Sequence, residues 1–112
     1  MKIAMPLIAD KISQHFGHSE NFLITEVDKD AKKVISKQLL VPPEHEPGVL
    51  PRWLKELGVN CLITCGIGQR AVDLLKQSGV NVIAGIEPQD ADTAINHFLN
   101  DELESGKNVC DH

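Results

Sequence analysis

The stretch VNCLITCGIGQRAVDLLKQSGVNVIAGI, residues 59–86, decides the fold of this chain. It begins with a continuous apolar run (59–65), passes through a glycine turn into a helical stretch that ends at Gly79, and closes with a second apolar run (80–86). Continuous apolar runs are typical of parallel strands that are covered on both faces. A strand, a helix and a strand in succession form a right-handed parallel crossover. The sequence therefore predicts an α/β domain with parallel strands at its centre.

The residues before this stretch predict more strands than helices. Residues 2–8 form an apolar strand, and residues 9–20 are expected to form a loop. Residues 21–28 alternate in polarity, and residues 33–41 return after a short turn, which predicts an antiparallel hairpin. The proline-rich segment 42–48 cannot form a helix interior or a central strand.

Three helices are predicted from the spacing of apolar residues. The first covers residues 49–57, with Trp53 on its apolar face and Gly58 as its stop; the second covers residues 69–79. The third begins after Asp90 and packs a stripe of small and apolar residues. The predicted order is β-β-β-α-β-α-β-α, a mixed five-stranded sheet with helices on its faces. Residues 1–104 are expected to form one domain, followed by a flexible tail (105–112).

Composition excludes several classes of protein. The chain has 112 residues, 42% of them hydrophobic, and its formal net charge is -5, which argues against a nucleic-acid partner. The first strand contains no acid, and Asp10 comes only after it, which argues against a two-metal nuclease. No apolar stretch reaches the ~18 residues that span a bilayer, and no signal peptide is recognisable at the start, so we expect a cytoplasmic protein.

The segment Cys65-Gly66-Ile67-Gly68-Gln69-Arg70 is the first candidate binding site. It follows a parallel strand and opens a helix, which is where α/β proteins gather ligands and where free N–H groups attract anions. Arg70 lies in the first helical turn, and Cys65 lies at the end of the strand. The glycines can equally serve only a tight turn. The segment also matches a relaxed dinucleotide fingerprint with Glu87 downstream, but the chain has too few βαβ units for that fold.

Other residues are candidate metal ligands. His15 and His18 lie in one loop, and His45 lies between two glutamates in the proline-rich segment. Cys110 and His112 close the chain and form its one closely spaced soft pair. The odd count of three cysteines, with no C-x-x-C pair, argues against a disulfide framework. The histidines can also be solvated loop residues, and the tail can bind nothing.

Four segments, FGHSENFLI, HEPGVLPRWLKELGV, GIGQRAVDLL and the closing NVCDH, together resemble the nitrogenase iron–molybdenum cofactor biosynthesis accessory family, with its NifX-type cofactor-binding domain. The resemblance implies a three-layer ribonuclease H-like fold, with a mixed five-stranded sheet between helices. It implies a small non-catalytic carrier or storage domain that binds an iron–sulfur or molybdenum-containing metallocluster, with donor and acceptor proteins as partners. The candidate cofactor-binding residues are Phe16, Gly17, Cys65, Gly66, Gly68 and Arg70, and the candidate metal ligands are His18, His45, Cys110 and His112.

Two other functions fit the same residues. The first is a regulatory domain that binds phosphate or a nucleotide at the Gly66–Gly68 turn. The second is a protein–protein adaptor without a ligand. The sequence determines neither the cluster type nor the oligomeric state.

Overall fold

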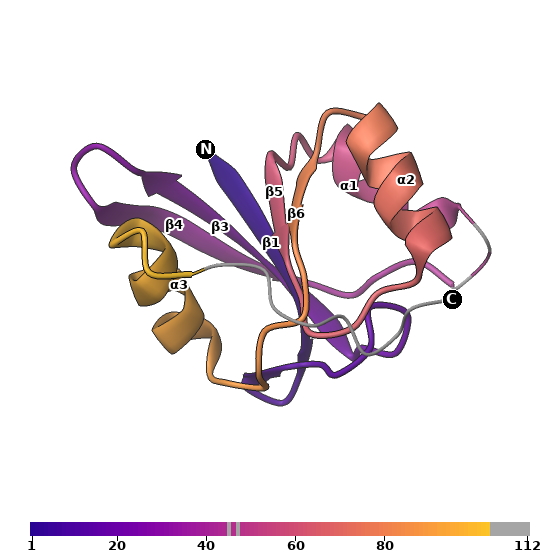
Figure 1. Ribbon diagram of the computed structural model, residues 1–112, viewed down its shortest axis with the longest axis horizontal. Coiled ribbons are helices and arrows are strands. Elements are labelled where there is room, and N and C mark those ends of the chain that lie inside the picture. Colours follow the sequence, from indigo (N-terminus) through magenta and orange to yellow (C-terminus); the bar gives the residue numbers. More distant parts are fainter. Residues whose placement is uncertain (45, 47, 104–112) are drawn as a thin grey trace.

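The chain is described by a computed structural model that covers residues 1–44, 46 and 48–103. The elements, in chain order, are β1 (Lys2–Ile8), β2 (Lys11–Ile12), β3 (Asn21–Asp28), β4 (Lys33–Leu40), α1 (Val49–Glu56), β5 (Cys61–Ile63), α2 (Gln69–Gln77), β6 (Asn81–Ile83) and α3 (Ala91–Leu99). The sheet has the order β4-β3-β1-β5-β6, with β2 added to β1 (Figure 1). None of these helices is long and apolar enough to cross a membrane.

The sheet is mixed, as the sequence predicted. β1 with β3 and β3 with β4 pair antiparallel, whereas β1 with β5 and β5 with β6 pair parallel. The antiparallel hairpin of β3 and β4 therefore lies on one side of the parallel strands β1, β5 and β6. The fold expectation of an α/β sheet with helices on both faces is confirmed.

The helices divide the core into two layers. On one face α3 packs Ala94 and Ile95 against residues of β1 and β5 such as Met5 and Ile63. On the other face α1 and α2 cover a second cluster that includes Leu62 of β5. Figure 1 shows α3 on one side of the strands and α1 beside α2 on the other. The side chains of the central strands alternate between the two layers because successive strand residues point to opposite faces.

The structure corrects the predicted elements in two places. A sixth strand, β2, lies in the segment 9–20 that was expected to be a loop, because Ala9 adopts a left-handed φ of 56° and the chain turns back onto β1. Ile12 is then buried opposite Leu7. The strands β5 and β6 are each three residues long, rather than the seven residues predicted from the apolar runs 59–65 and 80–86. Apolar patterning reports burial, and the flanking apolar residues are buried in turns outside the ladder.

Candidate anion-binding site

The loop after β2 and the turn after β5 lie side by side. The backbone N–H of Phe16 donates to the carbonyl of Gly66 over 2.8 Å, and the N–H of Gly66 donates to the carbonyl of Gln14 over 2.9 Å. A parallel bridge thus pairs His15 with Gly66, so the loop continues the sheet for one more step. Two of the four segments that carry the family resemblance, the Phe-Gly loop and the glycine turn, therefore form one structural unit, although they lie fifty residues apart in sequence.

Ser13 fixes the conformation of this loop through hydrogen bonds to its backbone. Its side chain is buried, and its hydroxyl lies 2.9 Å from the carbonyl oxygen of His15 and 2.7 Å from that of His18. The same hydroxyl oxygen accepts the N–H of His15 over 3.2 Å, and the N–H of His18 donates to the carbonyl of His15 over 3.1 Å. The loop is thereby held in a tight turn with both imidazoles exposed. Sequence reasoning did not identify Ser13, because a single serine gives no signal without its distant partners.

A pocket of about 500 Å³ opens where this loop, the start of α1 and the start of α2 meet. The structure brings six of the ten predicted site residues to its wall, namely Phe16, Gly17, His18, Gly66, Gly68 and Arg70. It adds Glu46 and Gly48, which were not predicted as site residues, and His15, which was considered beside His18 but not included in the predicted ligand set. The rest of the wall is apolar and comes from both helices and the turn, through Leu50, Pro51, Ile67, Ala71 and Leu74.

Two helix N-termini face this pocket. α2 starts after Gly68, and its first backbone bond of the helical type runs from Val72 N–H to the carbonyl of Gly68 (3.2 Å). α1 starts after Gly48, whose φ of 81° is left-handed and suits glycine, and the N–H of Arg52 donates to the Gly48 carbonyl (3.4 Å). The amide groups ahead of the first bond in α2 have no acceptor in their own helix, whereas in α1 Pro51 has no N–H and the N–H of Val49 donates to the carbonyl of Glu46 (3.1 Å). Each N-terminus carries a partial positive charge.

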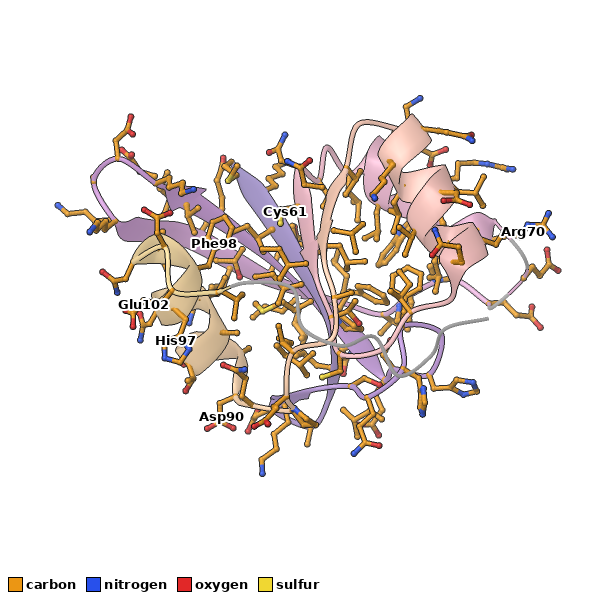
Figure 2. The ribbon with its side chains drawn as sticks, in the orientation of Figure 1. Cys61, Arg70, Asp90, His97, Phe98 and Glu102 are labelled. Carbon is orange, nitrogen blue, oxygen red and sulfur yellow. The ribbon has the colours of Figure 1, made fainter. Side chains whose placement is uncertain are left out.

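Charged side chains add to this field. Arg70 is exposed in the first turn of α2 and lines the pocket. Figure 2 shows it projecting from the outer end of α2, on the other side of the molecule from α3. Glu46 is the one carboxylate among the described residues of the pocket wall. A small pocket with two helix N-termini and an arginine suits a compact anion, although the chain as a whole carries a net charge of -5.

The two imidazoles at the mouth can supply nitrogen ligands. The ring centroids of His15 and His18 are 6.0 Å apart with the planes nearly perpendicular at 77°. Among residues 1–44, 46 and 48–103, no group of three or more His, Cys, Asp or Glu side chains is placed to hold a metal ion. The described part of the pocket therefore offers two imidazole rings, two helix N-termini and an arginine that attract anions, rather than a closed metal site.

Cys65 does not join this pocket. Its side chain is buried in the core on the α3 side of the sheet, with Sγ 3.9 Å from the carbonyl oxygen of Ile12. Burial raises the pKa of this thiol, which keeps it protonated and a poor ligand. Cys61 lies on the same face, and burial raises its pKa to about 11. Cys61 is thus an inert core thiol, whereas the alternation of the chain directs Cys65 away from the glycine turn.

Three of the predicted metal ligands, His45, Cys110 and His112, lie outside the described residues, as does the tail 105–112. The structure therefore places His18 alone among the four predicted metal ligands, and it places that residue at the pocket.

Comparison with known proteins assigns the family. An uncharacterized protein of Methanocaldococcus jannaschii, MJ0580, is 33% identical over 107 residues, which cover 93% of this chain and 90% of that protein. The crystal structure of PH0822 matches with a TM-score of 0.85 and 28% identity over 94% of each chain. The apo form of the orange protein from Desulfovibrio gigas matches with a TM-score of 0.74 and 20% identity, over 96% of this chain and 93% of that one, which shows the shared fold. The family model described as "Dinitrogenase iron-molybdenum cofactor" matches residues 1–101, and the chain belongs to that family.

Proposed function

We propose that this protein is a non-catalytic carrier that binds an anionic iron–sulfur or molybdenum-containing metallocluster as cargo. The observation that carries the proposal is the convergence of two helix N-termini, Arg70 and two imidazoles on one pocket of about 500 Å³. The family description, which names the iron-molybdenum cofactor, agrees with a cluster of this kind. Donor and acceptor proteins of the cluster would be its partners, and the cytoplasm its compartment.

The chemistry of the pocket fits such a cargo. Metal–sulfur clusters are often anionic, and backbone N–H groups at helix N-termini donate hydrogen bonds to anions without carrying a full charge themselves. His15 and His18 provide nitrogen ligands at the mouth. Soft thiolate ligands would come from Cys110, with His112 and His45 as further donors. All three of these residues lie outside the described part of the chain, so their contribution rests on their chemistry alone.

The exposure of the ligands suits a carrier rather than a store. His15, His18 and Arg70 are all exposed, and each reaches the cargo from a loop or a helix end. A cluster held in this way can be released without breaking the packed core, because few buried contacts change. Exposed binding groups of this kind favour the transfer of the cluster from one protein to another.

A phosphate- or nucleotide-binding regulatory domain is the second candidate. It is favoured by one specific observation: the described wall of the pocket contains no cysteine, while its helix N-termini and arginine suit phosphate equally well.

One titration separates the two candidates. Purified protein is mixed anaerobically with tetrathiomolybdate, a molybdenum–sulfur dianion, and binding is followed in the visible spectrum; parallel samples receive inorganic phosphate or ATP. We expect tetrathiomolybdate to bind and Arg70→Ala to weaken that binding about tenfold or more, in line with the ~1.5–3 kcal/mol of a charge-assisted hydrogen bond.

The matched control is Arg52→Ala, which removes the same charge from an exposed position of α1 that does not line the pocket. Equal affinities for the two variants would refute the pocket as the binding site. Binding of phosphate or ATP in the absence of any response to tetrathiomolybdate would favour the regulatory domain instead.

A further inference from the structure

The sheet ends in one long edge strand. In the part of the chain that the structure describes, β4 pairs with β3 alone, and it has eight residues, whereas β6 at the opposite edge has three. Figure 1 shows β4 at the side of the sheet away from α1 and α2. Every second residue of an edge strand directs its N–H and C=O away from its neighbour, so the edge is a template for a further strand.

The side chains of this edge are unusually apolar for their exposure. Ile35 is 63% exposed and Leu39 58% exposed, and Val41 directly after the strand is 77% exposed. These are the three most exposed large hydrophobic side chains among the described residues. Apolar side chains on an unpaired strand favour pairing with another chain, because pairing removes both the side chains and the backbone groups from water.

Two features normally protect such an edge, and both are weakened here. A bulge shifts the register between β3 and β4 at Ile35, but residues 36–40 pair regularly with β3. Lys37 would place a charge in the middle of the edge, but its ammonium group is bound by the carboxylate of Asp92 in α3. Residues 36–40 are therefore open to a partner strand, with Ile35 at the bulge that begins this segment.

We propose that β4 pairs antiparallel with β4 of a second copy of this chain, which joins two sheets across a two-fold axis. With Lys37 on the axis, Ile35 of each copy lies opposite Leu39 of the other, so the two exposed apolar residues pair twice. Each cross-strand apolar pair adds stability to the ladder. The two central lysines are tolerated because each already has Asp92 of its own chain as a counter-charge.

Charge around the strand favours the same arrangement. Antiparallel pairing sets the start of one β4 beside the end of the other. The start is preceded by the turn that carries Lys29 and Lys32, and the strand itself begins at Lys33; the end is followed by Glu44 and Glu46. Lys29 is already paired with Asp101 of its own chain over 3.3 Å, and Asp28 and Asp30 reduce the contrast further. The complementary charges therefore come from Lys32 and Lys33 of one copy and from Glu44 and Glu46 of the other. An acidic strand of a different protein would satisfy the lysines, but it would not use the reciprocal Ile35–Leu39 pairing.

The first test is the mass in solution as a function of concentration, measured by sedimentation velocity on the full chain. We expect a dimer of twice 12.3 kDa that dissociates on dilution. Ile35→Lys and Leu39→Lys should each raise the dissociation constant about tenfold or more, because each charge meets an apolar residue twice in a symmetric dimer. Ile8→Lys is the matched control, since Ile8 is a 47% exposed isoleucine at the end of β1 and outside this edge.

The second test fixes the register. In a Cys110→Ser background, Lys37→Cys should form a disulfide-linked dimer, because facing Cα atoms lie ~4.5–5.5 Å apart in antiparallel pairs and disulfides need ~4.4–6.8 Å. Gln38→Cys should cross-link far more slowly, because its partner across the axis is Ser36. A monomer at all concentrations, an equal effect of Ile8→Lys, or equal cross-linking of both cysteine variants would overturn the proposal. So would a monomer that binds an acidic peptide along this edge.

Discussion

Replacement of Phe22 by alanine should destabilise the protein more than almost any other single truncation. The Phe22 side chain is fully buried in β3, and its ring makes edge-to-face contacts with Phe16 at 5.8 Å and with Trp53 at 5.4 Å between centroids. The three rings connect the pocket loop to α1. Truncation of a buried phenylalanine costs ~3–5 kcal/mol, of which the two ring pairs contribute ~0.5–1.5 kcal/mol each.

This loss converts into a large change in melting temperature. An unfolding entropy of ~2.1 cal/mol/K per residue over 112 residues means that 1 kcal/mol lowers Tm by about 4 °C, so Phe22→Ala should lower it by roughly 12–20 °C. The free energy of unfolding is measured by urea titration followed with far-UV circular dichroism, a signal that does not depend on the tryptophan.

A double-mutant cycle tests the ring contact itself. Trp53 is only half-buried, so Trp53→Ala should cost less than Phe22→Ala, and less than its position on the apolar face alone suggests. The double variant should show a coupling of ~0.5–1.5 kcal/mol between the two rings, while Trp53→Phe should retain most of it. A coupling near zero, or a larger loss for Trp53→Ala than for Phe22→Ala, would refute this account of the core.

Three further predictions concern the loop, the core thiol and the tail. Ser13→Ala should speed hydrogen exchange at the His15 amide and weaken tetrathiomolybdate binding, since the hydroxyl holds the loop; unchanged exchange would contradict this. Burial raises the pKa of Cys61 to about 11, above its unfolded value of ~8.5. The native state therefore holds the proton more tightly, and this contribution to stability is complete below about pH 8.5 and is lost as pH rises through about 11. Urea midpoints of wild type and Cys61→Ala should converge over that range, and parallel curves would contradict it. Cys110→Ser, in the tail outside the described residues, should weaken the binding of a thiophilic metal or cluster with no change in the unfolding free energy, because thiolates are the softest ligands in the chain. Equal affinities for this variant and the wild type would remove the tail from the site and leave the pocket histidines as the ligands.

Local patterns predicted most of the fold because they report local physics. The alternation in residues 21–28 and the short turn that follows were enough to predict the hairpin, whose first strand is Asn21–Asp28 in the structure. The two apolar runs were enough to predict two parallel strands, but not their length, and only β5 is buried, because β6 lies at the sheet edge with its residues exposed or half-buried. Residues such as Val59 and Ile86 are as buried as a strand residue although they lie outside the ladder. β2 depended on the left-handed conformation of Ala9, which no pattern in the sequence reveals.

The site was predictable as separate parts but not as one site. The glycine turn and the Phe-Gly loop were identified singly, yet the hydrogen bonds that join them connect Phe16 with Gly66. Contacts over such a separation depend on the sheet order, which places β1 beside β5. Cys65 illustrates the opposite error of local reasoning. It neighbours Gly66 in sequence, but the side-chain alternation of an extended chain turns it into the other layer of the core.

The charge of the pocket follows from topology more than from any side chain. In a parallel crossover the helix runs antiparallel to its strands, so the helices before and after β5 both begin at the edge where that strand ends. Gly48 and Gly68 therefore meet at one pocket for the same reason that β5 lies parallel to its neighbours. The two N-termini should attract anions even without a basic residue, because their partial charges come from the backbone. For this reason the loss of Arg70 should weaken anion binding without abolishing it.

Gly48→Ala probes the backbone contribution directly. Gly48 has a φ of 81° at the start of α1, so a side chain there strains the left-handed turn and should tilt the helix N-terminus away from the pocket. Gly79→Ala is the matched control, because Gly79 has the same φ of 81° but follows α2 at its far end, outside the pocket wall. Both variants should lose similar stability in urea, whereas only Gly48→Ala should weaken tetrathiomolybdate binding in the visible titration. Equal affinities for the two variants would show that the start of α1 does not contribute to anion binding, and the N-terminus of α2 with Arg70 would then carry the site alone.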